Sequence, residues 1–307
     1  MRRKQRKSKR ILPIVFVFAI LAVGLYVFAI AAGGDGEGIR ADRTVTASDP
    51  MHLALGEASS AVHLSDFPAF TSPVHIDQIT DTQYLKLVNR DHAVAVPVRD
   101  TQLVTAWPDM PARTTYVTLH QTAFYAMRAL FAAANNANVG SLFIASGYRS
   151  HAEQSELYAN APDPAYVMPP GHSEHQLGLA ADILLGDDTT SMRGSPAAAW
   201  LAENAPEFGL ILRYPEEKQD ITGVPYEPWH FRYVGRIHAW YMAERSFVLE
   251  EYIAYLQERD GFQVDFDGKT YYVLYQRPEN GMIFVPENLN FWVSSANTGG
   301  YIVTAWR

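Results

Sequence analysis

Residues 173–182 read SEHQLGLAAD, and they overlap the apolar segment 179–185, LAADILL. A short apolar run that follows a Gly is typical of a buried strand. Gly178 takes up a positive φ at little cost, so the loop before this strand can fold back over it. We therefore expect the side chains of His175, in the loop, and Asp182, in the strand, to converge on one point.

A second segment, 227–230, reads EPWH and adds another imidazole and another carboxylate. Pro228 disfavours regular strand geometry, so Glu227 and His230 can face the same cavity. A catalytic zinc site uses three protein ligands from His, Asp, Glu or Cys and leaves a fourth position for water. A single His is more often structural than a ligand, but His175, Asp182 and His230 together predict a metal site. Glu227 is then the candidate general base.

The segment before these motifs places an arginine at the junction of a strand and a helix. Residues 142–145 are apolar and lead into Gly147-Tyr148-Arg149. Ser150 and Glu153 have the spacing of a capping box, which predicts that a helix starts at Ser150. An arginine at such a junction can point into a cleft instead of packing in the core.

Taken in order along the chain, these motifs resemble those of the zinc D-alanyl-D-alanine peptidases, a family that includes the VanY-type D,D-carboxypeptidases. The family pattern G-Y-R-S corresponds to residues 147–150, S-x-H-x-x-G-x-A-x-D to residues 173–182, and E-x-x-H to residues 227–230. The resemblance covers about residues 80 to 250, and three motifs in order are more specific than any one alone.

The resemblance implies an α+β fold of the kind shared with the hedgehog signalling domain, with a small antiparallel sheet flanked by helices. It implies one zinc ion held by His175, Asp182 and His230. Glu227 would take a proton from the attacking water and pass it to the leaving amine. Arg149 would stabilise the oxyanion or hold the substrate's terminal carboxylate, and Gln154 and Ser173 would contact the substrate.

The implied substrate is a peptidoglycan stem peptide ending in D-Ala-D-Ala, from which the enzyme removes the last residue. Two alternatives use the same metal site: a D-Ala-D-Ala dipeptidase and an endopeptidase that cuts L-alanyl-D-glutamate bonds. A third is a wall-binding module without catalysis, and the presence of Glu227 argues against it.

The amino terminus has the pattern of a membrane anchor. Residues 1–10 carry seven Lys or Arg, and residues 11–32 form an uncharged apolar run. As a helix this run would extend about 33 Å, enough to span a bilayer. Basic residues stay inside, so we expect a single-pass cell-membrane protein whose residues from about 33 onward lie outside the cytoplasm. A cleaved signal peptide is the alternative, with an A-x-A site at Ala29–Ala31.

Composition excludes several other classes of protein. The chain has 307 residues, of which 48% are hydrophobic, and it contains no Cys. Disulfides, Cys nucleophiles and Cys-based zinc sites are therefore excluded. Beyond residue 10, the remaining 18 Lys and Arg oppose 33 Asp and Glu, a formal charge of −15. Such a surface repels nucleic acid.

The rest of the chain divides by composition into three parts. A Gly-rich, polar linker is expected over 33–75, the zinc domain over 76–259, and a small β-rich module over 260–307 with turn pairs at 267–268, 280–281 and 299–300. Within the zinc domain the apolar pattern predicts strands near 84–88 and 93–98, and helices over 118–135 and 238–259.

Overall fold

The computed structural model describes residues 70–94, 98–186 and 192–307, all within one unit of the chain, Pro50–Arg307. The basic leader 1–10, the expected anchor 11–32 and the linker up to residue 69 lie outside the described residues. In the ranges that are described, no helix combines the length and the apolar character needed to cross a membrane.

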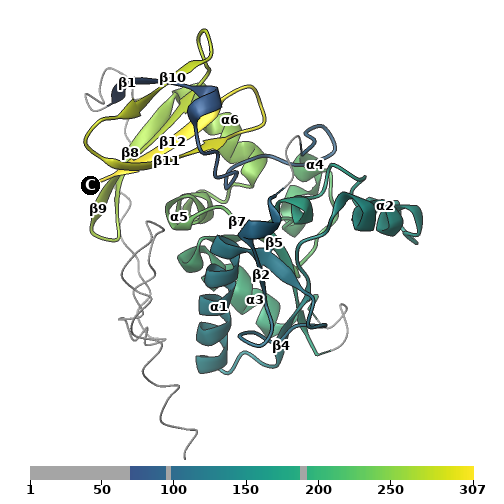
Figure 1. The fold of residues 1–307 in the computed structure, drawn as a ribbon. Coiled ribbons are helices and arrows are strands. Elements are labelled where there is room, and N and C mark those ends of the chain that lie inside the picture. The colour runs from purple at the N-terminus through teal and green to yellow at the C-terminus, as the bar shows by residue number, and fades with distance from the viewer. Residues whose placement is uncertain (1–69, 95–97, 187–191) are drawn as a thin grey trace, which may run out of the picture. The chain divides into compact units, whose positions relative to one another are not determined.

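A four-stranded antiparallel sheet with the strand order β4-β5-β7-β6 forms the centre of the zinc domain (Figure 1). Its strands are β4 Leu142–Ser146, β5 Ala180–Leu185, β6 Leu210–Leu212 and β7 His230–Tyr233. A smaller sheet pairs β2 Leu103–Thr105 with β3 Thr118–His120. The small antiparallel sheet expected for an α+β fold is therefore present.

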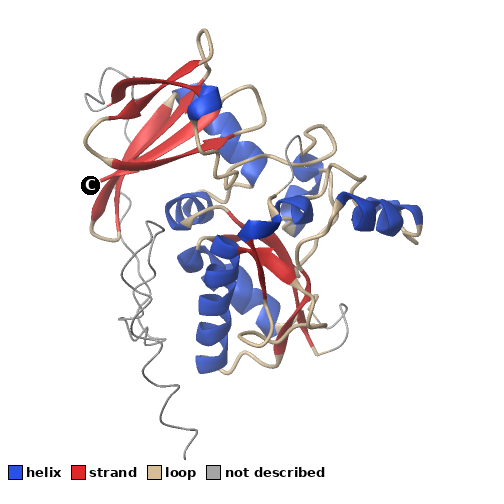
Figure 2. Cartoon of the chain, viewed as in Figure 1, coloured by secondary structure: helices blue, strands red, loops and turns tan. Residues whose placement is uncertain are grey.

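Six α-helices are found among the described residues (Figure 2). They are α1 Gln121–Asn136, α2 His151–Ala159, α3 Pro196–Asn204, α4 Gln219–Thr222, α5 Arg236–Glu244 and α6 Leu249–Arg259. Short 3-10 helices are η2 Ile76–Gln78, η3 Asp100–Gln102, η4 Pro164–Tyr166, η5 Glu174–Leu177, η7 Ala205–Phe208 and η8 Glu216–Lys218.

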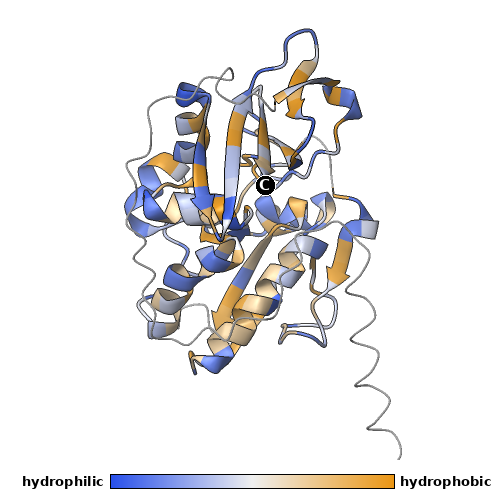
Figure 3. Cartoon of the chain, turned by 90° about the vertical axis from the view of Figure 1, so that its left-hand side faces the viewer, coloured by the Kyte–Doolittle hydropathy of each residue, from blue (hydrophilic) through white to orange (hydrophobic). Residues whose placement is uncertain are grey.

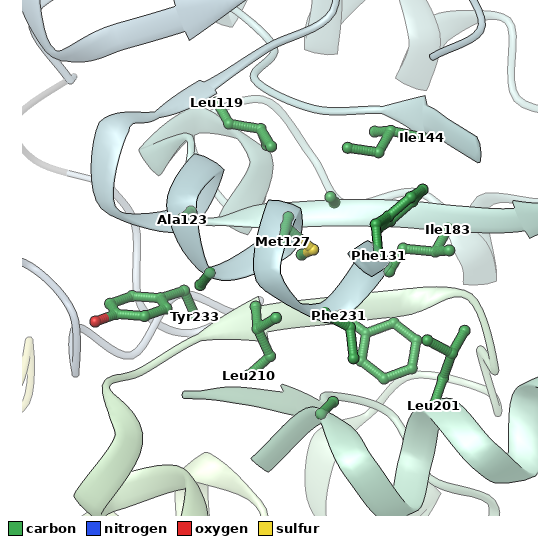
Figure 4. Packing of buried hydrophobic residues seen from close by; sticks show 14 of the residues in the cluster. Leu119, Ala123, Met127, Phe131, Ile144, Ile183, Leu201, Leu210, Phe231 and Tyr233 are labelled. Carbon is green, nitrogen blue, oxygen red and sulfur yellow. The ribbon is translucent and has the colours of Figure 1, made fainter. Parts of the chain in front are cut away.

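The core of the zinc domain lies between α1 and the central sheet. Met127 and Leu130 of α1 are fully buried, and they share one cluster with Ile183 of β5 and Phe231 of β7 (Figure 4). The apolar positions of α1 recur at a spacing of three or four residues, which places them on one face. Truncating a core Met of this kind to Ala typically costs about 2–5 kcal/mol.

The start of α2 agrees with the capping box read from the sequence. Ser150 Oγ accepts a hydrogen bond from the amide of Glu153 at 3.2 Å, and Glu153 Oε2 accepts one from the amide of Ser150 at 2.7 Å. These two bonds satisfy amides that the first turn of a helix leaves unpaired. The helix therefore begins at His151 with Ser150 as its N-cap, and Arg149 lies between this cap and the end of β4.

Some expected elements differ from those observed. Residues 84–88 are not a strand; instead, Arg232 Nη2 donates to the carbonyls of Gln83, Tyr84 and Lys86 at 3.1–3.2 Å, which fixes an irregular backbone. Residues 93–98 form no strand where they are described, and 95–97 lie outside the description. The helix expected over 238–259 is two helices, α5 and α6, because Ser246 takes a φ of +54° between them.

The carboxy-terminal residues form a second antiparallel sheet with the order β11-β12-β9-β8. Its strands are β8 Gly261–Phe266, β9 Lys269–Gln276, β11 Asn290–Ser295 and β12 Tyr301–Trp306. Asp267 and Gly268 both have positive φ, as the predicted hairpin turn requires. Figure 3 shows hydrophobic residues along the strands, while many connecting turns are hydrophilic.

The expected linker is too long at its carboxyl end. Residues 70–75 form strand β1, Phe70–His75, which pairs antiparallel with β10, Met282–Pro286. The first described residues of the chain therefore pair with the β-rich module, although they precede the module's own sequence, 260–307, by about 185 residues. A strand pairing of such sequence separation leaves no local signal, which is why composition assigned these residues to the linker.

The β-rich module shares a core with the zinc domain. Leu85, Met242 and Leu249 are fully buried in one cluster with Val273 of β9 and Ile302 of β12. Residues 84–88 also contact the module through the backbone, since the amide of Leu87 donates a hydrogen bond to the carbonyl of Ala296 at 3.1 Å. Buried apolar surface thus joins the two parts of the chain.

At the centre of this junction lies His238 of α5, which is fully buried. Its Nδ1 lies 2.6 Å from Tyr252 Oη in α6, and its Nε2 lies 3.0 Å from Thr304 Oγ1 in β12. Both ring nitrogens are therefore hydrogen-bonded to hydroxyl groups. Burial lowers the pKa of His238 to about 3, so the imidazole is neutral in the folded protein.

Candidate metal centre

The pairing of β5 with β7 places Asp182 opposite His230. Directly opposed residues in an antiparallel pair project to the same face of the sheet. Asp182 Oδ1 lies 3.1 Å from His230 Nδ1. Because both residues are fixed by backbone register, two of the three predicted ligands meet without help from any flexible loop.

The third predicted ligand, His175, comes from η5, which precedes β5. The chain turns back at Gly178, where φ is +67°, as the sequence predicted. His175 Nδ1 lies 2.7 Å from the carbonyl oxygen of Gly147 and can donate only as Nδ1–H. This tautomer leaves the lone pair on Nε2, which lies 3.4 Å from Asp182 Oδ2. A Cβ at position 147 would collide with the carbonyl of Thr118, so the close approach here requires Gly.

The three predicted ligands are spaced as a zinc ion requires. One ligand atom from each of His175, Asp182 and His230 lies within 4.8 Å of the others. Ligand bonds of about 2.0–2.2 Å in a tetrahedral site separate neighbouring ligand atoms by about 3.4 Å. Two imidazoles and one carboxylate are also the donor types that zinc prefers, and a fourth position stays open. The residues therefore fit one zinc ion.

Burial and mutual contact set the charge of these groups. Burial, reinforced by the charge of Arg149, lowers the pKa of His175 to about 4. Burial opposes ionisation of Asp182, yet the two imidazoles hold its pKa well below the usual range. Burial also works against a charged His230, but hydrogen bonds to Asp182 and Glu174 raise its pKa to about 9. Without a metal, His230 is therefore the ligand imidazole that carries the additional proton at neutral pH, while His175 is neutral.

Glu227 lies beside the predicted ligands and is nearly buried, with 6% of its surface exposed. Its Oε2 is 3.8 Å from His230 Nδ1. The amide of His230 donates to the carbonyl of Glu227 at 3.1 Å, and this tight turn brings both side chains to one side. Burial raises the pKa of Glu227 to about 8, with Asp182 adding to the effect and His230 opposing it. A carboxyl group with such a raised pKa is suited to exchange protons near neutral pH.

All seven residues that the sequence assigned to the site line one cavity of about 260 Å³. They are Arg149, Gln154, Ser173, His175, Asp182, Glu227 and His230. Two of them carry buried polar atoms with no protein partner: Arg149 Nε and Gln154 Oε1. Unpaired buried donors and acceptors are costly, so their presence together in a cavity is typical of a binding site whose ligand completes them.

The cavity also contains residues that sequence reasoning missed. Met168, Tyr214 and Val224 form a small apolar cluster on its wall. Tyr166 and Trp229 line it as well, with ring centroids 6.5 Å apart. Trp229 lies inside the E-x-x-H motif, where its position next to a ligand was a usable signal. The others are separated from the motifs in sequence and have no such signal.

The comparisons with known proteins agree with this geometry. A family model described as VanY, D-alanyl-D-alanine carboxypeptidase, matches residues 116–236, a range that includes every predicted site residue. A D-alanyl-D-alanine carboxypeptidase of Enterococcus faecium is 44% identical over 169 residues, which are 55% of each chain. A bifunctional D-Ala-D-Ala dipeptidase and carboxypeptidase of Enterococcus gallinarum, VanXYC, is 42% identical over 128 residues, 38% of this chain and 67% of that protein.

The chain belongs to the VanY family. The solved structure of the vancomycin resistance D,D-dipeptidase VanXYg, bound to a phosphinate analogue of D-Ala-D-Ala, covers 77% of this VanY-family chain. The match extends over 98% of that structure, with 28% sequence identity and a TM-score of 0.64. The chain spans about half the length of the Enterococcus faecium relative, 55%.

Proposed function

We propose that this chain is a zinc-dependent D-alanyl-D-alanine carboxypeptidase that removes the terminal D-Ala from peptidoglycan stem peptides. One observation carries the proposal: the three-ligand set, the buried Glu227 and the unpaired polar atoms of Arg149 and Gln154 line a single cavity. Family membership supports the same activity.

Each residue of the site has a task that its position suits. His175, Asp182 and His230 would hold the zinc ion, which when bound supplies Lewis-acid activation of water and of a carbonyl oxygen. Glu227 accepts the proton of the attacking water and delivers it to the leaving amine, because it lies on the ligand side of the cavity. The raised pKa of its carboxyl group favours holding that proton between the two steps.

Substrate binding falls to the groups that lack partners. Arg149 is half-buried, and its guanidinium has a buried, unpaired Nε, which suits the terminal carboxylate of a peptide or the developing oxyanion. Gln154 Nε2 is occupied by the carbonyl of Met168 at 2.6 Å, so its free Oε1 accepts a hydrogen bond from a substrate N–H. Ser173, which is buried in the same cavity, contributes a hydroxyl.

The proposal is tested by incubating the full chain with purified muropeptides, with and without a zinc chelator, and weighing the products by mass spectrometry. We expect loss of one alanine mass from pentapeptides, and no loss after chelation. Hydrolysis of added free D-Ala-D-Ala to two D-alanines, without loss of alanine from pentapeptides, would identify a dipeptidase, and cleavage after L-alanine would identify an endopeptidase. Binding to muropeptides without cleavage would identify a wall-binding module.

We further propose that residues 11–32 anchor the chain in the cell membrane and that the zinc domain acts outside the cytoplasm. The support is the uncharged apolar run and the basic leader that precedes it. The chain has no Cys, so a Glu156→Cys variant, at an exposed position of α2, provides a single thiol. Labelling of this thiol in intact cells by a membrane-impermeant maleimide is expected; labelling only after lysis would place the domain inside.

A further inference from the structure

Glu174 occupies the variable position of the S-x-H motif, and its carboxylate is completely buried. Its two oxygens have different neighbours. Oε1 lies 2.9 Å from Arg213 Nε and 3.0 Å from Arg232 Nη1, while Oε2 lies 3.5 Å from His230 Nε2. One carboxylate therefore joins two buried guanidinium groups to a predicted metal ligand.

The charges of this group are balanced without the metal centre. Arg213 also forms a double hydrogen bond with Glu250 of α6, in which Nη1 and Nη2 lie 2.8 and 2.7 Å from the two carboxylate oxygens. Two guanidinium groups thus face two carboxylates; Arg213, Arg232 and Glu174 are fully buried, and Glu250 exposes 14% of its side chain. A carboxylate placed between two guanidinium groups, which only donate, serves as a hydrogen-bond acceptor.

The carboxylate of Glu174, as a hydrogen-bond acceptor at His230 Nε2, determines which nitrogen of that ring keeps its lone pair. His230 Nδ1 faces Asp182, one of the other two predicted ligands, whereas Nε2 faces Glu174. A proton held on Nε2 by Glu174 leaves the lone pair on Nδ1, where a metal would bind. At His175 the carbonyl of Gly147 has the opposite effect, because it accepts a hydrogen bond from Nδ1–H and leaves the lone pair on Nε2.

We propose that Glu174 is a positioning residue of the metal centre, which selects the Nδ1-binding tautomer of His230 and is itself held in place by Arg213, Arg232 and Glu250. This inference rests on the proposed zinc site. A carboxylate behind a ligand His typically contributes about 10- to 100-fold to metal affinity. His230 on β7 is thereby connected, through Glu174 and Arg213, to Glu250 on α6, which lies outside both ligand motifs.

The test measures zinc affinity by competition with a chromogenic chelator, independently of any peptidase assay. Glu174→Gln keeps the shape but removes the charge, and we expect zinc binding about 10- to 100-fold weaker. Glu174→Asp keeps a negative charge near Arg213 and Arg232 but moves the carboxylate away from His230 Nε2. We expect a loss of zinc affinity between those of the wild type and Glu174→Gln. Zinc affinity within twofold of wild type in either folded variant would overturn the proposal.

Glu250→Gln serves as the matched control. It removes a carboxylate from the same buried network, but one that does not contact His230. Thermal unfolding of the metal-free proteins should show lower stability for both Glu174→Gln and Glu250→Gln. Zinc affinity should fall strongly only in the Glu174 variants, with a change well below tenfold for Glu250→Gln. Equal losses of zinc affinity in both would indicate a structural role alone and overturn the proposal.

A spectroscopic measurement keeps the proposal testable if the Glu174 variants do not fold. Long-range proton–nitrogen NMR spectra of the zinc-loaded wild type report which nitrogen of His230 carries the proton. We expect a protonated Nε2, and a proton on Nδ1 would overturn the proposal. If the wild type binds zinc but cleaves no muropeptide, the proposed function fails while the tautomer and affinity results still decide the role of Glu174.

Discussion

Asp182 and His230 are register partners on neighbouring antiparallel strands, and their facing atoms Oδ1 and Nδ1 are 3.1 Å apart. The pairing has a functional consequence, because the backbone hydrogen bonds of β5 and β7 hold two metal-binding side chains at a fixed separation. A site built on strands in this way is more precise than one built on loops. The remaining ligand, His175, depends on the turn at Gly178.

The first prediction concerns Glu227. Replacing it by Gln keeps the side-chain shape but removes proton acceptance, so we expect D-Ala release to fall by about 10²- to 10⁴-fold. None of the three predicted ligands is altered, so zinc affinity should change little. Release rates from pentapeptide at saturating zinc, compared with wild type, measure the effect. Release at the wild-type rate would rule out Glu227 as the proton acceptor.

The second prediction concerns the pH dependence of zinc binding. His230 has a pKa raised to about 9 in the metal-free protein, while His175 is already neutral because its pKa is about 4. Zinc must therefore displace one imidazole proton at pH 6–8, and apparent affinity should weaken about tenfold for each unit that the pH falls.

The number of protons released on zinc binding is best measured in the Glu227→Gln variant, because glutamine at this position carries no carboxyl proton that could add to the count. Calorimetric titration with zinc in two buffers of different ionisation enthalpy should give release of about one proton per zinc at pH 7. Binding without proton release would contradict the assignment of the proton to His230.

The third prediction concerns Gly178. Ala at this position is strained by the φ of +67°, and its Cβ would lie only 3.0 Å from the backbone nitrogen of His120. We expect a loss of at least about 1–2 kcal/mol in the free energy of unfolding, together with weaker zinc binding because His175 shifts. Gly186→Ala is the control, since its φ of +69° is similar but nothing lies within 4 Å of the added Cβ. Denaturant unfolding should show a larger loss for Gly178→Ala, and equal losses would disprove a role for the close contact.

The fourth prediction concerns the junction with the β-rich module. The pKa of His238 is about 3 when folded and 6.5 in its unperturbed state, so the unfolded chain binds a proton that the native protein does not. Stability contributed by His238 is therefore present above pH 6.5 and lost as the pH falls below it. Between pH 7 and pH 5 the expected loss is about 2 kcal/mol.

A His238→Asn variant isolates this effect, because all other titrating groups remain. Denaturant unfolding at pH 7 and pH 5 should show a smaller decrease for the variant than for wild type, by about 2 kcal/mol. The same decrease in both proteins would mean that His238 accepts a proton without loss of packing.

The residues of the site could be predicted from the sequence because each motif consists of residues that lie close together in the chain. The capping box at Ser150 and Glu153, the turn at Gly178 and the hairpin at Asp267 are all determined by residues a few positions apart. In these places the backbone has few alternatives, so spacing and residue type suffice to predict the conformation.

Other features depend on contacts between distant segments, and the sequence does not reveal them. Residues 84–88 are apolar enough for a strand, but the backbone carbonyls of Gln83, Tyr84 and Lys86 accept hydrogen bonds from the guanidinium of Arg232 and not from a neighbouring strand. Glu174 reads as an arbitrary residue of its motif, because its partners Arg213 and Arg232 lie elsewhere in the chain. Ser246 separates α5 from α6 with a positive φ that Ser rarely adopts, and neither Gly nor Pro marks the break.

The core that α5 and α6 share with β9 and β12 determines how this chain can be shortened. A truncation after Arg259, at the end of the motif-bearing part, would uncover Met242 and Leu249 and remove the Thr304 hydroxyl from His238. Such a fragment would expose an apolar surface and would tend to aggregate during production. Recombinant versions meant for crystallisation or screening should therefore extend through Trp306 and begin no later than Phe70, so that both closing strands are kept.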